Sequence, residues 1–435
     1  MSIQAVRYAL SAGAVASLLS GCAESQVPAL APDSGVTAPF AKSLLPDASV
    51  NSLYSFEGGA DGAYPDATPI YVKRQLFGTT TLGGNGGCRE VHGCGTVYRL
   101  SSSGQEHVLH AFTSGNDGAA PSGSLLDVRG SLLGTTVYGG GSGCKSGRAS
   151  GCGTVFELTS AGDERVLYRF TGAVEGAHPD SSLVPFKRAL YGEAAAGGSG
   201  KCNTYDYRGC GLVYEMSRSG RVKVVYRFKG DKDGGTPQGG LVLLDGNFYG
   251  TTTGGGSDAC YVSNGCGTVF KLTPSGSESI LHAFTGGPND GAIPVGGLVV
   301  LNGALYGATS TGGAYNCGLT YYLPCGAVFK LTPSGQEQII YNFKGGMDGA
   351  SPNGLIAAGG TLYGTTESGG QGCDLGCGTI FELSRSGNEA ILYRFKGGVE
   401  PAAPTSGPIE VRGTLYGTTE VGGRYGDGTV YAFAP

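Results

Sequence analysis

The segment GLVVLNGALYGAT, residues 297–309, contains two apolar runs separated by Asn302-Gly303. Asn-Gly between apolar runs is a strong signal for a β-hairpin, because the type I′ turn needs a positive φ at both central residues. Farther along lie GAVFKL (326–331), the turn TPSG (332–335) and EQIIYNF (337–343). These runs are rich in β-branched and aromatic residues and are bounded by Gly, Pro, Asn or Ser, which is typical of strands. The region therefore predicts a unit of four short strands.

This unit recurs seven times along the 435 residues of the chain. Each copy contains an apolar residue followed by an anchor glycine and usually Thr-Thr, and successive anchor glycines are 53 to 58 residues apart. A fixed period of this length indicates a supersecondary unit that buries its apolar faces by stacking on its neighbours. The anchor glycines are Gly78, Gly134, Gly192, Gly250, Gly307, Gly364 and Gly417.

Seven units of four strands predict an all-β fold, a seven-bladed β-propeller of four-stranded antiparallel blades. The last unit ends after its third strand, GTVYAF (428–433), and the missing fourth strand stands at the other end of the chain, VNSLYSF (50–56). We expect this N-terminal strand to pair with the C-terminal blade and close the ring, whereas an open solenoid would need capping repeats. The predicted propeller spans residues 49–435, and the 83 glycines suit its many turns.

The first 48 residues differ in composition from the repeats. Arg7 precedes a run of small and apolar residues that ends in Leu19-Ser20-Gly21-Cys22, which predicts a secretory signal at residues 1–21. Leu-Ser-Gly-Cys resembles a bacterial lipobox, in which the cysteine carries the lipid; a plain signal peptide is the alternative. Residues 22–48 contain four prolines and predict a flexible tether. The expected partner is a membrane, and Ala23 after Cys22 favours, by resemblance to Gram-negative lipoproteins, the outer membrane.

Twelve of the 13 cysteines form close pairs, one pair in each of the first six units, in the loop between strands two and three. Thiols that face each other across a hairpin mouth suit disulfide geometry, and export permits their oxidation. Zinc is the alternative, but it needs four ligands and these loops offer two thiols without a repeated His. We therefore expect disulfides, no metal and no cofactor, with Cys22 left for the lipid. The expected pairs are Cys88–Cys94, Cys144–Cys152, Cys202–Cys210, Cys260–Cys266, Cys317–Cys325 and Cys373–Cys377.

The recurring pattern Leu-Tyr-Gly-Thr-Thr, Gly-Gly, Gly-Thr-Val-Phe-x-Leu, Ser-Gly and Leu-Tyr-x-Phe resembles the GloVer tandem repeat of bacterial surface proteins. The resemblance covers nearly all of residues 49–435. It implies an exported, anchored repeat protein, and it brings no established activity and no catalytic residue. The third unit departs from the pattern, because Glu193-Ala194-Ala195 follows its anchor glycine.

Each unit also carries an acid after its outer strand, followed by Pro four residues later. Seven carboxylates in a ring could hold calcium, but one acid recurs per loop, whereas a calcium loop supplies several oxygen ligands. An acid in such a turn can instead satisfy local backbone donors, so we expect a structural role. The acids are Asp61, Asp117, Glu175, Asp233, Asp290, Asp348 and Glu400.

The loops between strands two and three and the loops between blades should emerge on one face, where binding residues are expected. In the third to fifth units these loops carry tyrosines with charged residues among them, an aromatic sector that suits a surface glycan or a protein partner. The alternative is that the tyrosines pack on their own loops. The candidate binding residues are Tyr205, Asp206, Tyr207, Arg208, Tyr261, Tyr315, Tyr321 and Tyr322.

The sequence thus favours a binding or interaction scaffold at the bacterial cell surface. A net charge of −5 gives no reason to expect nucleic acid as a partner. The alternative is a secreted polysaccharide-active hydrolase or lyase that uses carboxylates near the propeller channel. Candidates for this chemistry lie on or just after second strands, at Glu193, Glu367 and Glu420.

Overall fold

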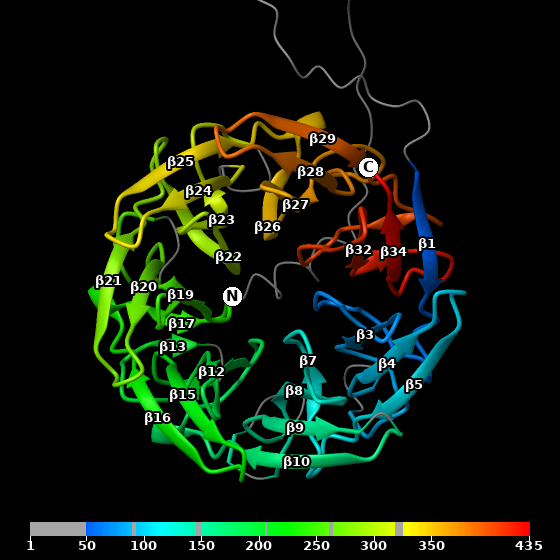
Figure 1. The fold of residues 1–435 in the computed structure, drawn as a ribbon, viewed down its shortest axis with the longest axis vertical. Helices are drawn as coiled ribbons and strands as arrows, with labels where there is room; N and C mark the ends of the chain where they lie inside the picture. The colour runs from blue at the N-terminus through cyan, green and yellow to red at the C-terminus, as the bar shows by residue number, and fades with distance from the viewer. Residues whose placement is uncertain are drawn as a thin grey trace, which may run out of the picture. The chain divides into compact units, whose positions relative to one another are not determined.

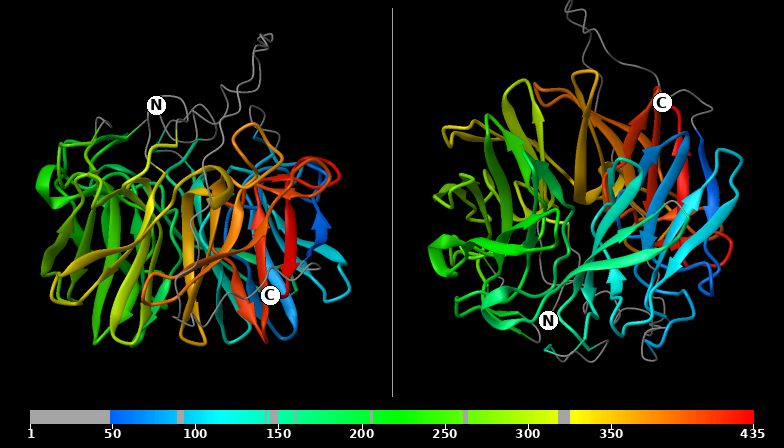
Figure 2. Two further views of the ribbon diagram at one scale, coloured as in Figure 1. Left: turned by 90° about the horizontal axis from the view of Figure 1, so that it is seen from above. Right: turned by 60° about the horizontal axis from the view of Figure 1, so that its bottom comes forward.

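The structure, a computed structural model, describes residues 49–435 except 89–92, 142, 145–149, 160, 205–206, 261–263 and 318–324. The predicted signal segment, Cys22 and the tether lie outside the described residues. Seven sheets of four or five strands are arranged around a ring (Figure 1), which confirms the predicted seven-bladed, all-β propeller. In Figure 2 the strands run from one face of this ring to the other.

The first three blades follow the predicted order of strands from the inside of the ring to the outside. Blade 1 contains β2 (Ile70–Val72), β3 (Gln75–Thr80), β4 (Thr96–Leu100) and β5 (Glu106–Ala111). Blade 2 contains β6 (Ala119–Pro121), β7 (Leu126–Val128), β8 (Ser131–Tyr138), β9 (Thr154–Leu158) and β10 (Glu164–Arg169). Blade 3 contains β11 (Val184–Phe186), β12 (Ala189–Ala194), β15 (Leu212–Ser217) and β16 (Val222–Arg227), and a small hairpin joins β13 (Asn203–Thr204) to β14 (Tyr207–Arg208).

The remaining blades repeat this order. Blade 4 contains β17 (Gly235–Pro237), β18 (Val242–Leu244), β19 (Asn247–Gly254), β20 (Thr268–Leu272) and β21 (Glu278–Ala283). Blade 5 contains β22 (Gly291–Leu301), β23 (Ala304–Gly312), β24 (Ala327–Leu331) and β25 (Glu337–Asn342). Blade 6 contains β26 (Ala350–Ala358), β27 (Thr361–Ser368), β28 (Thr379–Leu383) and β29 (Glu389–Arg394). Blade 7 contains β31 (Ile409–Val411), β32 (Thr414–Thr419), β34 (Thr429–Phe433) and β1 (Val50–Ser55), beside the pair β30 (Pro401–Ala402) and β33 (Val421–Gly422).

Pairing of the two chain ends closes the ring. β1 is antiparallel to β34, with Val50 opposite Phe433 and Ser55 opposite Thr429. The Phe56 N–H donates to the carbonyl of Gly428 at 3.0 Å and continues this contact beyond the strand. The predicted closure is therefore confirmed, and it covers the edge that β34 would otherwise expose.

Local sequence explains the turns and the anchor glycines. Asn302 and Gly303 have φ values of 51° and 74°, as the type I′ turn between β22 and β23 requires. The anchor Gly307 faces the ring of Phe329 on the neighbouring strand, and a Cβ on it would lie 2.5 Å from the ring carbon Cζ. The same close approach recurs at Gly78, where a Cβ would lie 2.3 Å from the Tyr98 hydroxyl oxygen. The anchor position is glycine because an aromatic ring takes the space of a side chain.

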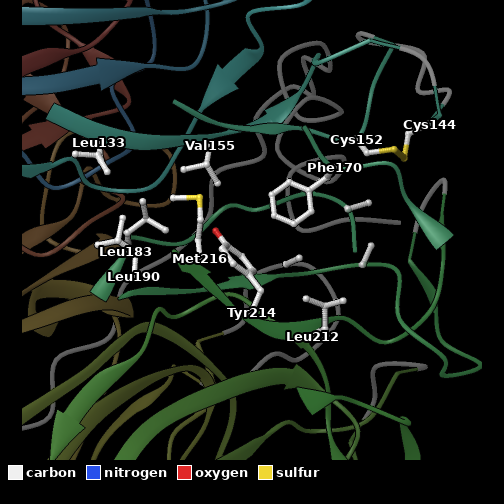
Figure 3. Packing of buried hydrophobic residues seen from close by; sticks show 13 residues of the cluster. Leu133, Cys144, Cys152, Val155, Phe170, Leu183, Leu190, Leu212, Tyr214 and Met216 are labelled. Atoms are coloured by element: carbon white, nitrogen blue, oxygen red, sulfur yellow. A yellow bond between two sulfur atoms is a disulfide. The ribbon is translucent and has the colours of Figure 1, made fainter. Parts of the chain in front are cut away.

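Neighbouring blades pack through one repeated aromatic pair. The Phe that follows each outer strand meets the aromatic residue of the third strand of the next blade edge to face, with ring centroids 5.1 to 5.4 Å apart. Figure 3 shows one such pair, Phe170 and Tyr214, within the apolar cluster between blades 2 and 3. The core is therefore divided into small inter-blade clusters. Apart from β-strands, the described residues contain three short 3-10 turns, η1 (Ala173–Glu175), η2 (Asp231–Asp233) and η3 (Gly346–Asp348), and no helix long and apolar enough to span a membrane.

Candidate functional site

One face of the ring is built from two kinds of loop. The junction loop leads from the outer strand of one blade to the next blade, and the Cys loop joins the second and third strands of a blade. At every junction a glycine N–H of the Cys loop donates to a carbonyl of the junction loop before it, at 2.6 to 3.0 Å. The donor–acceptor pairs are Gly84–Gly59, Gly140–Gly115, Gly198–Ala173, Gly256–Asp231, Gly313–Asp290, Gly370–Gly346 and Gly423–Glu400. The two kinds of loop therefore share one surface, which we call the loop face.

Disulfides hold the Cys loops in blades 1 to 6. The twelve paired cysteines are joined as the sequence predicts, with Cα–Cα distances of 4.9 to 5.4 Å: Cys88–Cys94, Cys144–Cys152, Cys202–Cys210, Cys260–Cys266, Cys317–Cys325 and Cys373–Cys377. Each closes a loop of four to eight residues, which corresponds to about 2 kcal/mol in the chain-entropy model. Such a set of disulfides indicates an extracytoplasmic protein.

The recurring acids close their own junction loops. Asp233 and Asp348 each accept the backbone N–H of the residue four positions earlier, from Lys229 at 2.7 Å and from Lys344 at 2.8 Å. Asp61 and Asp117 accept equivalent bonds from Glu57 and Thr113. This geometry agrees with the structural role expected for the acids.

Two of these acids, Asp233 and Asp348, also take part in a contact between blades that the sequence did not predict. The Tyr226 hydroxyl on β16 of blade 3 lies 2.6 Å from Asp233 and 3.2 Å from Glu278, the first residue of β21 in blade 4. Tyr341, Asp348 and Glu389 repeat the arrangement between blades 5 and 6, at 2.6 and 3.2 Å. We call each such set a junction triad.

The phenol of a junction triad has a single proton, which it can donate to one carboxylate only. The second carboxyl must carry a proton of its own if it is to share this contact. Burial, with the charge of the nearby aspartate, raises the pKa of Glu278 and of Glu389 to about 7. These glutamates can therefore be protonated near neutral pH. Burial likewise raises the pKa of Glu106, beside Tyr54 and Asp61, to about 7.

A signal for the junction triads exists in the sequence. In five junctions the loop acid is Asp and the next outer strand begins with Glu: Asp61 and Glu106, Asp117 and Glu164, Asp233 and Glu278, Asp290 and Glu337, Asp348 and Glu389. In the other two the loop acid is Glu and the strand begins with Val: Glu175 and Val222, Glu400 and Val50. These two junctions thus have one carboxyl group where the other five have two, and this paired variation between loop acid and strand residue is visible when the seven units are aligned.

Exposed apolar side chains gather on the loop face. Six of the eight large hydrophobic residues exposed in the described part of the chain lie in its loops. Five of these six are consecutive around blades 5 to 7, and they are 45% to 77% exposed. They alternate between Cys loops and junction loops. The Gly370–Gly346 hydrogen bond connects the loops of Leu375 and Met347, and the Gly423–Glu400 hydrogen bond connects the loops of Tyr425 and Val399. We call this set the apolar arc: Tyr315, Met347, Leu375, Val399 and Tyr425.

The candidate aromatic sector lies mostly outside the described residues. Tyr205, Asp206, Tyr261, Tyr321 and Tyr322 lie outside them. Tyr207 and Arg208 form β14, and Arg208 is exposed. Tyr315 is 45% exposed and is the one sector tyrosine whose side chain the structure describes; it begins the apolar arc.

The carboxylates proposed for an enzyme lie on three blades, on or just after the second strands β12, β27 and β32. Glu193 is fully buried, and its Oε2 accepts the backbone N–H of Gly240 from blade 4 at 2.8 Å. Burial, with the nearby charge of Asp180, raises the pKa of Glu193 to about 8. At the same place blades 2, 6 and 7 have a threonine that donates to a carbonyl of the next blade, as Thr135 does to the Ser181 carbonyl at 3.1 Å. Glu193 therefore links blades, and Glu367 and Glu420 are partly buried and have polar partners of their own.

Solved structures with a similar fold include the computationally designed Ika8 protein, 12% identical with a TM-score of 0.48, over 88% of this chain and 98% of that one. A putative gluconolactonase is 12% identical with a TM-score of 0.43, over 89% of this chain and 92% of that one. A gluconolactonase from Xanthomonas campestris is 13% identical with a TM-score of 0.43, over 90% of this chain and 91% of that one. At these identities and scores the likenesses say nothing about function.

A search of curated protein sequences finds no match. The Gloeobacter/Verrucomicrobia repeat, in contrast, matches residues 41–204, 89–322 and 321–435, which together span the whole propeller. The sevenfold hairpin, the anchor glycines and the closed ring are the structural form of that repeat, and the chain belongs to the Gloeobacter/Verrucomicrobia repeat family.

Proposed function

We propose that this protein is a lipid-anchored, exported propeller that binds a glycan or protein at the bacterial cell surface through its loop face. The observation that carries the proposal is the apolar arc. Exposed apolar side chains cost free energy in water, and contiguous sets of them usually mark interaction sites. Disulfides and glycine hydrogen bonds fix the backbone of the loops, so a partner would meet a preformed surface.

The arc is chemically suited to binding. Tyr315 and Tyr425 offer aromatic rings with hydroxyl tips, and the Arg424 guanidinium lies 5.6 Å from the centroid of the Tyr425 ring. Met347, Leu375 and Val399 add aliphatic surface between them. Mixed aromatic, aliphatic and Arg contacts of this kind dominate the free energy of many interfaces.

A polysaccharide hydrolase or lyase is less well supported. Glu193 has no exposed surface, so a polymer cannot reach its carboxyl group in this conformation. Its position between blades accounts for the raised pKa of this carboxyl without a catalytic role.

The test is a binding measurement with the arc removed. A variant with Leu375, Val399 and Tyr425 all replaced by Ser should lose binding to isolated cell envelopes and to a glycan array by tenfold or more. Its melting temperature should change little, because the replaced side chains are mostly exposed. The matched control is Leu243→Ser, which removes a 36% exposed leucine from β18, outside the loop face, and should bind like the parent.

A second arm tests the aromatic sector predicted from the sequence, with Tyr205, Tyr207, Tyr321 and Tyr322 replaced by Ser. Loss of binding in this variant alone would move the site from blades 5 to 7 toward blades 3 to 5. Unchanged binding in both variants would reject the loop face as the binding surface.

A further inference from the structure

Two of the junction triads contain a histidine in place of tyrosine. His282 on β21 takes the place that Tyr226 has on β16 and Tyr341 has on β25. Its Nε2 lies 3.0 Å from Asp290 Oδ1, and ligand atoms of His282, Asp290 and Glu337 all lie within 4.8 Å of one another. The histidine thus brings a nitrogen ligand to a site that already has two carboxylates.

We propose that His282, Asp290 and Glu337 form a binding site for a divalent first-row metal ion such as zinc, which would cross-link blades 4 and 5. Imidazole nitrogen and carboxylate oxygen are both ordinary zinc ligands, and three protein ligands leave one tetrahedral position for water. His282 belongs to blade 4, Asp290 to the junction loop and Glu337 to β25 of blade 5.

The distance between His282 and Asp290 suits a metal of this size, and Glu337, whose ligand atom lies within 4.8 Å of the other two, can complete the site by a side-chain adjustment. Zinc lies about 2.0 to 2.1 Å from nitrogen or oxygen ligands, which places two ligand atoms of a tetrahedron about 3.3 Å apart. The observed 3.0 Å between His282 Nε2 and Asp290 Oδ1 needs to open by only a few tenths of an ångström. Calcium fits the site less well, because it takes six to eight oxygen ligands.

The surroundings hold the ligands in place and leave a path for the ion. Asp290 Oδ2 accepts the backbone N–H and the hydroxyl of Thr285, at 2.8 and 2.7 Å, which fixes the carboxylate. Glu337 Oε1 is buried and has no hydrogen-bond partner among the described residues, so the glutamate has an unused oxygen. The side chains of His282 and Asp290 remain 20% and 14% exposed, so the site can be reached from solvent.

Tyrosine at the equivalent place gives an internal comparison. In the triad of Tyr341, Asp348 and Glu389 the phenol hydroxyl lies within 3.2 Å of both carboxyl groups. A neutral phenol fills the space and offers no strong metal ligand. His282→Tyr should therefore rebuild a contact that the fold already uses while it removes the nitrogen ligand.

The junction between blades 1 and 2 has an equivalent set of one histidine and two acids, but its contact is longer. His110 Nε2 lies 3.4 Å from Asp117, and Glu164 is near them. The experiment therefore uses the full-length protein without a polyhistidine tag and with His110→Tyr as the background. After removal of metals with a chelator, zinc chloride is titrated by calorimetry and the melting temperature is recorded with and without zinc. Cobalt(II) is titrated in parallel, and its visible absorption reports a tetrahedral site.

We expect one equivalent of zinc to bind to the background protein and to raise its melting temperature. Adding His282→Tyr should weaken zinc binding at least about tenfold and abolish both the temperature shift and the cobalt absorption. If His282→Tyr fails to fold, Glu337→Gln, which removes one carboxylate ligand, should give the same loss. Equal zinc binding with and without His282, no zinc binding at all, or stabilisation by calcium instead of zinc would each overturn the proposal.

Discussion

Glu278→Gln should remove a pH-dependent loss of stability from the junction between blades 3 and 4. In the native protein Glu278 lies 3.2 Å from the Tyr226 hydroxyl, and that hydroxyl also lies 2.6 Å from Asp233. Burial and the charge of Asp233 raise the pKa of Glu278 from its ordinary 4.5 to about 7. The folded protein therefore holds this proton more tightly than the unfolded chain does.

The sign of the effect follows from this shift. The stabilisation from the bound proton is complete below about pH 4.5, declines as the pH rises toward 7, and is absent above the folded pKa. A shift of roughly 2.5 pKa units corresponds to about 3 kcal/mol. Because Glu278 is half-exposed, screening by water reduces this to roughly 1 to 2 kcal/mol.

The measurement is the free energy of unfolding in guanidinium at pH 5 and pH 8, with the disulfides kept oxidised. The parent should lose roughly 1 to 2 kcal/mol more than Glu278→Gln between the two pH values, because glutamine offers an N–H donor in place of the carboxyl O–H and cannot ionise. Glu57→Gln, at an exposed position, is the matched control and should follow the parent. Equal pH dependence in the parent and in Glu278→Gln would refute the shared-proton account of the junction triad.

Two further predictions concern the lipid anchor and the pairing between the loop acid and the first residue of the next outer strand. Cys22→Ser should abolish acylation and release the protein from membranes; an unchanged mass and unchanged fractionation would reject the lipid anchor. Val222→Glu alone should destabilise the junction between blades 2 and 3 by about 1 to 3 kcal/mol, because it places a second carboxyl group near Glu175 at a partly buried position. Val222→Glu combined with Glu175→Asp should recover most of that loss, since it reproduces the pair found in five other junctions; chemical unfolding measures both.

Much of the fold could be predicted because its determinants are local. Asn302-Gly303 specifies a turn whatever surrounds it, and the anchor glycines mark where an aromatic ring must approach the backbone. Ring closure was also predictable, since the strand at residues 50–56 carries the outer-strand pattern and the last unit lacks it. Sevenfold repetition made each of these signals stronger than it would be in a single copy.

The candidate site was harder to predict because exposure and burial depend on the assembled blades. Glu193 stood out in the sequence as a carboxylate in place of threonine, but the structure buries it between blades, bonded to Gly240. The apolar arc has a weaker signal in the sequence: Met347 and Val399 stand directly before the junction acids, where three other units have Asn or Lys. Nothing local distinguishes an exposed valine from one that packs inward.

Contacts that recur at every junction maintain the scaffold, whereas side chains that differ between blades are free to serve binding. Aromatic pairs, glycine hydrogen bonds and junction acids recur at every junction because each blade needs them to hold its neighbour. Selection for a ligand cannot change these positions without a loss of stability. The side chains of the apolar arc make few such contacts, so they can change while the scaffold stays intact. Under the proposed binding role, a family built on this propeller can keep one fold and vary its partner through the loop face.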